Sequence, residues 1–104
     1  MYGDTTTIRA LARRLRERAD EIRDLATDLT ARADAVPWTG LAADAMRAHA
    51  GVRLASLLRT ARLHEDAAEA LERHAREVDR LKELLHDAKD LAEGAVDGLK
   101  GLLT

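Results

Sequence analysis

A chain of 104 residues with a formal net charge of −2 fits one small domain and has no global attraction for nucleic acid or anionic membranes. Cysteine is absent, which excludes a disulfide framework, a thiol nucleophile and a cysteine-based metal site. Ala and Leu make up 38 of the 48 hydrophobic residues, and there is no Phe, one Tyr and one Trp. Because Ala and Leu favour helices and strand-forming residues are scarce, the composition predicts an all-α fold.

The first helical pattern covers about residues 5–36. Asp4 offers an N-cap side chain before it, and Pro37 disfavours a helical conformation at the residue that precedes it. Apolar residues recur every seven positions, as in a helix-packing seam, with alanines beside them. The seam residues of this segment are Ile8, Leu15, Ile22 and Leu29, and the flanking alanines are Ala12, Ala19, Ala26 and Ala33.

A second helical pattern runs from about residue 41 to residue 93 without a proline. Charged pairs one turn apart, such as Glu69–Arg73 and Glu72–Arg76, are expected on its exposed side. Gly94, Gly98 and Gly101 follow, so we expect residues 94–104 to form a flexible tail. The seam of this second segment consists of Leu57, Leu71, Val78 and Leu85, with His64 at the same heptad position as a polar notch that sets the register.

The short turn at residues 37–40 predicts a single helical-hairpin domain over 1–104, because a short connection forces two helices to lie antiparallel. A tight turn would place Thr5 opposite Glu72 and leave residues 73–93 without a partner in the first helix. Amphipathic helix of that length would expose more apolar surface than soluble monomers tolerate. We therefore expect the hairpin to dimerise into a four-helix bundle, with a kink that folds the tail back as the alternative.

Catalytic, cofactor-binding and metal-binding residues are not indicated by the sequence. The segment that begins His64-Glu65 has Ala68 where an H-E-x-x-H zinc motif needs its second histidine. His86 and Asp90 lie one turn apart, but two ligands do not make a metal site. The chain has a single Ser and no glycine-rich turn for an oxyanion hole, so we expect no enzyme activity. The stretch IRALARRLRER is basic, but acidic residues follow and no aromatic residue is interleaved, which favours a solvated face over a nucleic-acid site.

The start of the sequence lacks the apolar core of a signal peptide, and no run of about 20 apolar residues could span a membrane. If the protein leaves the cell, we expect a route that does not use a signal peptide, with the protein cytoplasmic before export. Arg outnumbers Lys by 14 to 3, which is typical of GC-rich genomes such as those of actinobacteria.

Between the two helical patterns lies Trp38-Thr39-Gly40, a W-x-G motif. With the hairpin layout, the length and the absence of cysteine, it makes the chain resemble the WXG family of ESX-type proteins, which type VII secretion systems export. The resemblance implies a non-enzymatic homodimer or heterodimer with another WXG-like chain, acting as a secreted substrate or as the partner of an effector. It also implies contacts with a toxin or effector and with the secretion ATPase.

The same resemblance points to an export signal, Y-x-x-x-D/E, after the second helix. The closest match is His86-Asp87-Ala88-Lys89-Asp90, which keeps the acidic residue at Asp90 and has His86 in place of the tyrosine. One alternative is therefore a chaperone or targeting subunit that binds a co-encoded toxin through helix packing. Another is a protein that binds membrane surfaces through its long amphipathic helix, although the composition argues against a membrane partner.

Overall fold

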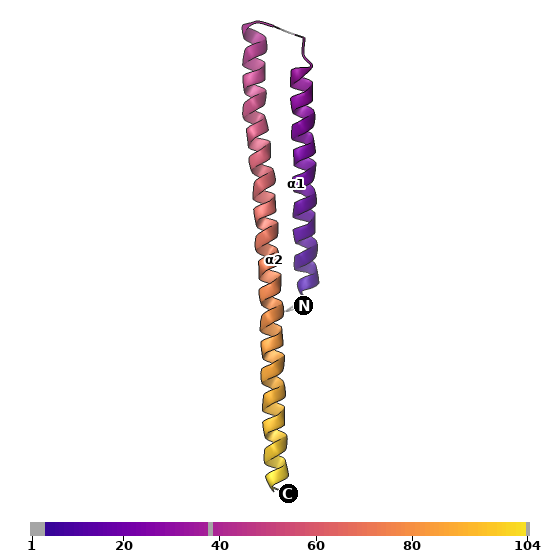
Figure 1. Ribbon diagram of the computed structural model, residues 1–104, viewed down its shortest axis with the longest axis vertical. Helices are drawn as coiled ribbons and strands as arrows, with labels where there is room; N and C mark the ends of the chain where they lie inside the picture. Colours follow the sequence, from indigo (N-terminus) through magenta and orange to yellow (C-terminus); the bar gives the residue numbers. More distant parts are fainter. Residues whose placement is uncertain (1–3, 38, 104) are drawn as a thin grey trace.

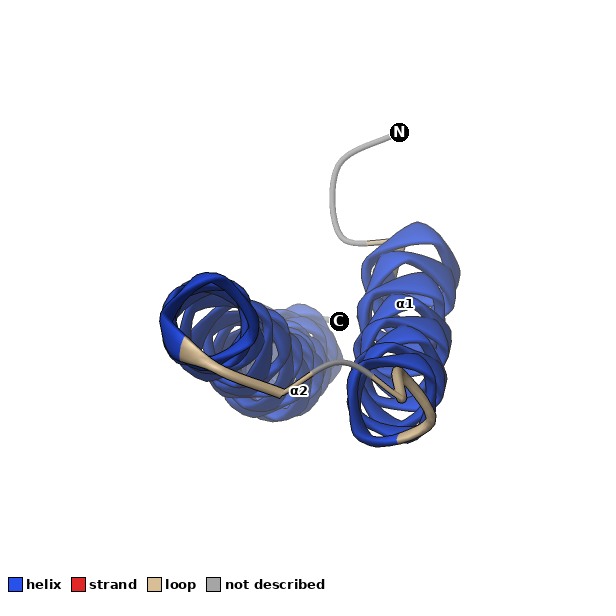
Figure 2. Cartoon of the chain, turned by 90° about the horizontal axis from the view of Figure 1, so that it is seen from above, coloured by secondary structure: helices blue, strands red, loops and turns tan. Residues whose placement is uncertain are grey.

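The computed structural model describes residues 4–37 and 39–103 and shows an antiparallel helical hairpin (Figure 1). Helix α1 is Thr5–Asp34 and helix α2 is Leu41–Leu103. The molecule is a rod of 96 × 16 × 15 Å, and a view along its axis shows the two helices as neighbouring cylinders joined by the connection (Figure 2). The all-α hairpin predicted from the sequence is thus confirmed.

Helix α1 begins at a side-chain cap and ends at a backbone hydrogen bond. Asp4 is the N-cap and accepts a hydrogen bond from the Thr6 amide at 2.9 Å, which confirms the capping role expected for it. At the other end, the Ala35 amide donates to the Ala31 carbonyl at 3.0 Å. The helix stops at Asp34, two residues before the predicted boundary at Val36, because the proline at 37 restricts the residues that lead into it.

The connection, residues 35–40, carries the chain from α1 to a start of α2 that lies beyond the end of α1 (Figure 1). Arg47 holds it by donating from Nη2 to the Val36 carbonyl at 3.0 Å. Gly40 ends the connection with a φ of +102° and accepts from the Asp44 amide at 3.0 Å. A side chain at this φ would be strained, so glycine is required for the chain to enter α2 in this direction.

Helix α2 continues without interruption to Leu103, so the described part of residues 94–104, predicted as a flexible tail beyond the helix, is helical. Each of the three glycines costs a helix about 1 kcal/mol relative to alanine. Adding residues to an existing helix carries no nucleation cost, however, and good helix formers separate the glycines. Figure 1 shows one long, unbroken rod, which does not fold back on itself.

The buried centre of the hairpin is made of alanine. Among the described residues, every buried hydrophobic side chain is alanine, and Thr5 is the buried polar residue. We call the six that face each other along the two helices the alanine rows; Ala43, in the first turn of α2, is buried as well. The alanine rows consist of Ala12, Ala19 and Ala26 in α1 and Ala61, Ala68 and Ala75 in α2.

The predicted Ile/Leu seam therefore does not form the centre of the hairpin. Most of its members lie three residues after a buried alanine, about 60° around the helix, and all but Leu85 are half-buried along one side of the interface. Both rows repeat every seven residues, so periodicity alone could not tell which row faces the other helix. We call the half-buried row the apolar margin, and it consists of Ile8, Leu15, Ile22, Leu29, Leu57, Leu71 and Val78.

The register of the hairpin also differs from the prediction. Thr5 donates from Oγ1 to Asp79 Oδ1 at 3.0 Å, so Thr5 lies beside Asp79 and not beside Glu72, one heptad earlier. The prediction assumes a tight turn, with the end of α1 level with the start of α2. In the structure α2 begins beyond the end of α1, so its first turns lie alongside the connection and the pairing with α1 starts later in α2 (Figure 1). As a result α2 is paired with α1 as far as Asp79, and residues 80–103 extend alone. We call these 24 residues the α2 extension; they span about 36 Å.

Candidate interaction surfaces

Three ion pairs between the helices close one side of the hairpin. Arg9 Nη2 lies 2.7 Å from Asp79 Oδ2. Arg16 pairs with Glu72, and Arg23 pairs with Glu65. The arginines and their acidic partners both recur every seven residues, four positions after Thr5 or after a buried alanine. We call this set the ion-pair ladder.

Helix geometry explains why the ladder and the apolar margin lie on opposite sides. At 100° per residue, a position four after an alanine lies about 40° to one side of it, and a position three after lies about 60° to the other side. In an antiparallel pair each flank faces the same flank of the other helix. Arginines on α1 therefore meet carboxylates on α2, and Glu72 pairs with Arg16 across the interface instead of with Arg76 in its own helix. The expected pair Glu69–Arg73 is present at 3.8 Å.

The ladder stabilises its carboxylates in the charged form. The hydrogen bond from Arg23 lowers the pKa of Glu65 below its ordinary 4.5, and that from Arg16 lowers the pKa of Glu72 in the same way. The pKa of Asp79 falls below 3.8, chiefly because Arg9 donates to it and also because Thr5 does. Because these groups are in contact with water, each pair stabilises the fold only modestly, and the ladder acts mainly on geometry.

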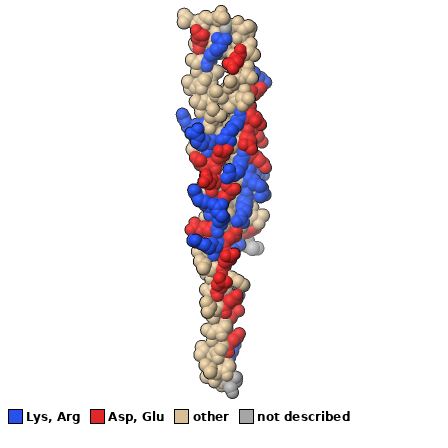
Figure 3. Space-filling view, in the orientation of Figure 1, with Lys and Arg blue, Asp and Glu red and all other residues tan. Residues whose placement is uncertain are grey.

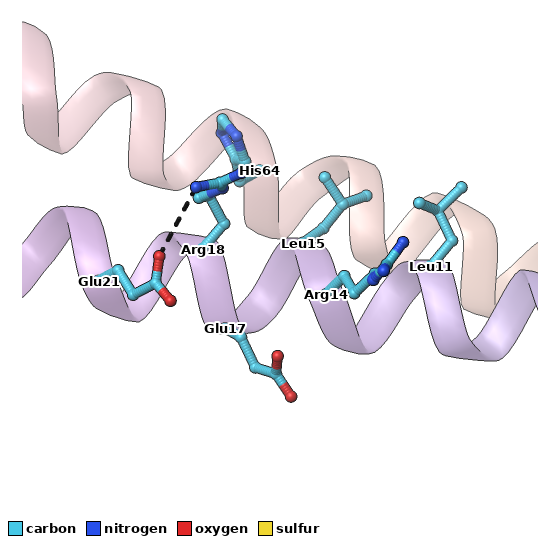
Figure 4. Close-up of a pocket in the computed structure, with 7 residues that line it drawn as sticks. All are labelled: Leu11, Arg14, Leu15, Glu17, Arg18, Glu21 and His64. Atoms are coloured by element: carbon cyan, nitrogen blue, oxygen red, sulfur yellow. Dashed lines mark ion pairs between the residues drawn. The ribbon is translucent and has the colours of Figure 1, made fainter.

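The apolar margin opens onto a shallow groove of about 610 Å³ on the other side of the hairpin. Figure 4 shows Leu11, Leu15 and Arg18 of α1 pointing toward α2, where His64 completes the lining, while Glu17 points away. His64 donates from Nδ1 to the Thr60 carbonyl of its own helix at 2.8 Å. The polar notch predicted at this position is thus a half-buried side chain that bonds within its own helix. The polar contacts that join the two helices in this register come from the ion-pair ladder.

The α2 extension presents the longest helical surface that is not packed against α1 among the described residues. Each of its residues from 80 to 103 is exposed, including large apolar ones. Figure 3 shows charged side chains crowded over the middle of the rod, and larger uncharged areas toward both of its ends, one of which is the extension. Leu85 belongs here: it was predicted as a seam residue, but it is 71% exposed and lies beyond the reach of α1. The large apolar residues of the extension are Leu81, Leu84, Leu85, Leu91, Val96, Leu99, Leu102 and Leu103.

The two short motifs singled out in the sequence lie far apart on the rod. Trp38 falls outside the described residues, and Gly40 of the same motif is the glycine of positive φ at the start of α2. His86 and Asp90 lie on the extension, both exposed, with His86 Nε2 3.4 Å from Asp90 Oδ2. This spacing of one helical turn lets both side chains reach the same binding partner.

The described part of the chain offers neither a metal site nor a membrane-spanning helix. Within residues 4–37 and 39–103, no three His, Cys, Asp or Glu side chains are grouped so that they could hold a metal ion. No helix formed by these residues combines the length and the hydropathy needed to cross a bilayer.

A two-helix rod with a buried alanine interface and a long exposed end defines a helical-hairpin protein. Over residues 1–100 the chain matches the family described as "Putative T7SS secretion signal domain". The chain belongs to this family, which associates it with type VII secretion and with export by that route. A search of curated proteins and a search of solved structures each returned no match.

Proposed function

We propose that the protein is a WXG-like, non-enzymatic subunit of a type VII (ESX) pathway that dimerises and is exported as a substrate or as the partner of an effector. The family match over residues 1–100 carries the secretion part of this proposal. The W-x-G sequence at the turn and the hairpin layout support the narrower assignment to WXG-like proteins.

Dimerisation is supported by the surfaces that one hairpin leaves open. The apolar margin is half-buried along its whole length. On the extension, large apolar side chains such as Leu91 are mostly exposed, Leu91 to 75%. A second WXG-like chain packed along this side would cover both surfaces in a four-helix bundle. The ladder side is occupied by three ion pairs that have already formed within one hairpin.

Light scattering on purified protein tests the dimer. We expect a mass of twice the 11.4 kDa of the chain, or a complex with a co-encoded partner. Leu85→Glu with Leu91→Glu should return the wild-type dimer to monomer, because charges would have to be desolvated in the interface. Leu41→Glu is the matched control, since Leu41 is 90% exposed and lies at the other end of α2. A wild-type monomer at micromolar concentration, alone and with the neighbouring gene product, would contradict the proposal.

An export assay tests the role in the pathway. The protein should appear in the medium of a strain with an active type VII system and should be retained when the secretion ATPase is deleted. We expect Trp38→Ala and the pair His86→Ala and Asp90→Ala to reduce export, while Thr39→Ala and Lys89→Ala serve as controls at neighbouring positions. If the protein stays in the cell while a co-encoded toxin is exported only in its presence, it is a targeting subunit and not a substrate.

A further inference from the structure

The pairing of α1 with α2 repeats every seven residues, and a repeating interface can form in more than one register. Alanines, arginines and acidic residues all recur at this spacing in the paired part of the rod. Sliding α1 by one heptad along α2 would therefore bring the same residue types together again. What distinguishes the registers is how many favourable pairs each one makes.

The register one heptad nearer to the connection keeps most of the contacts. Arg9 would lie beside Glu72 and Arg16 beside Glu65, whereas Arg23 would meet Leu58. The ladder would then hold two ion pairs where the structure shows three. The alanine rows have the same period, so most of their length would also pack together again.

A slide in the opposite direction is excluded by the length of the connection. In the structure, with Thr5 beside Asp79, residue 34 lies level with residue 50, about 13 Å along the axis from the start of α2. Sliding α1 by one heptad toward the extension would raise this axial distance to about 24 Å. The connection would also have to cross the roughly 8–10 Å between the two helix axes. The seven residue steps from Asp34 to Leu41 reach at most about 24 Å. The slide toward the connection instead shortens the distance, so the chain permits it.

We propose that the hairpin has two heptad-related registers and that the Asp79 end of the ladder selects the one seen in the structure. Asp79 is the acidic residue whose pair exists only in this register, and both Arg9 and Thr5 bond to it. When α1 slides, residues 73–79 join the α2 extension, which grows from 24 to 31 residues and by about 10 Å. The fold thereby contains a device that changes how much of α2 is free to bind. A partner that packs on residues 73–79 favours the longer extension by binding that register better.

The position of α1 can be measured directly, because the chain has no cysteine of its own. Spin labels at Arg13→Cys and Asp87→Cys occupy exposed positions away from the ladder. In the observed register their axial offset is about 24 Å, and one heptad of sliding raises it to about 34 Å. Double electron–electron resonance on full-length protein, diluted with unlabelled protein to exclude distances between chains, reports the population of each register.

Substitutions that change the count of pairs make the test specific. Asp79→Ala with Leu58→Glu leaves two pairs in the observed register and creates a third in the shifted one, by placing a carboxylate at position 58 opposite Arg23. We expect the longer distance to predominate in this variant. Glu65→Ala is the matched control, because it also removes one pair from the observed register. It leaves two ion pairs in the observed register and one in the shifted register, so the distance between the labels should not change.

The outcome is decisive in either direction. A single, unshifted distance in the double variant, with helicity preserved by circular dichroism, would overturn the proposal. If that variant does not fold, Leu58→Glu alone gives three pairs in each register at a position that is 40% exposed, and a second population about 10 Å longer is then expected. Its absence in a folded Leu58→Glu protein would refute the second register. The result does not depend on whether the protein is exported.

Discussion

Arg9 and Asp79 lie 70 residues apart in the chain and meet in an arrangement that also includes Thr5. Arg9 donates from Nη2 to Asp79 Oδ2 and from Nη1 to Thr5 Oγ1, each at 2.7 Å, while Thr5 Oγ1 donates to Asp79 Oδ1 at 3.0 Å. The hydroxyl of buried Thr5 is thus satisfied by the ladder. This end of α1 is fixed to α2 by polar contacts, because neither helix places a large apolar side chain in the centre there.

The hairpin should lose stability in acid because of the ladder. The pKa values of Glu65, Glu72 and Asp79 are lower in the folded protein than their ordinary values of 4.5 and 3.8. Their contribution is therefore complete above about pH 5 and is lost as the pH falls through the folded pKa values. We expect the melting temperature, followed by circular dichroism, to fall between about pH 5 and pH 3.

A variant with neutral ladder residues separates this effect from general acid denaturation. Glu65→Gln, Glu72→Gln and Asp79→Asn together should melt at a lower temperature at about pH 7 and should show a weaker dependence on pH below about 5. Adding salt at neutral pH should likewise lower the melting temperature of the wild-type protein more than that of the variant. Equal pH profiles for the two proteins would mean that other carboxylates control the acid response.

The alanine rows should be intolerant of larger side chains. Ala68 is fully buried against α1, so Ala68→Leu must push the helices apart and should destabilise the hairpin by about 1–3 kcal/mol. Ala70→Leu is the matched control, because Ala70 is exposed on the same helix and leucine is nearly as good a helix former. Urea denaturation of the two variants gives the comparison. A stable Ala68→Leu protein would show that the interface is looser than the structure describes.

The fold could be predicted from the sequence because its signals are local. Asp4 before three threonines indicates a helix start, Pro37 and Gly40 interrupt the helical pattern, and a short connection leaves only an antiparallel hairpin. The row that forms the centre could not be predicted in the same way, since Ala12 and Ile8 belong to rows of equal period. Hydrophobicity alone favours the large apolar residues for the centre, although the small size of alanine is what allows close approach.

The register was missed because heptad repeats leave it ambiguous by multiples of seven residues. A tight turn by itself favours Thr5 beside Glu72. The sequence did contain the deciding signal: arginines at 9, 16 and 23 and acids at 65, 72 and 79 match in number and spacing. Counting ion pairs in each register would have selected the observed one. Interpreting the basic stretch near the start as a solvated face overlooks the acidic residues of the second helix with which its arginines pair.

Two glycines should respond in opposite ways to the same substitution. Gly40 has a φ of +102°, so Gly40→Ala forces an L-residue into a left-handed conformation and should destabilise the hairpin by about 1–2 kcal/mol. Gly51 lies within α2, and a Cβ added there meets no atom within 4 Å. Gly51→Ala should therefore stabilise the protein by about 0.5–1 kcal/mol. Chemical denaturation measures both, and a stabilising effect at Gly40 would contradict the structure of the turn.

The glycines of the α2 extension should limit its local stability without affecting the hairpin. Gly94, Gly98 and Gly101 each have open space where a Cβ would lie, and each should favour the helix by about 1 kcal/mol when replaced by alanine. Because residues 80–103 lie beyond α1, this gain cannot be transmitted through packing to the alanine rows. Hydrogen exchange in the triple alanine variant, at a dilution where the protein is monomeric, should therefore slow over residues 94–103 and stay unchanged over residues 61–75. If protection rose equally in both segments, the extension would have to be coupled to the hairpin through contacts that one chain does not make, as in a dimer that packs along its whole length.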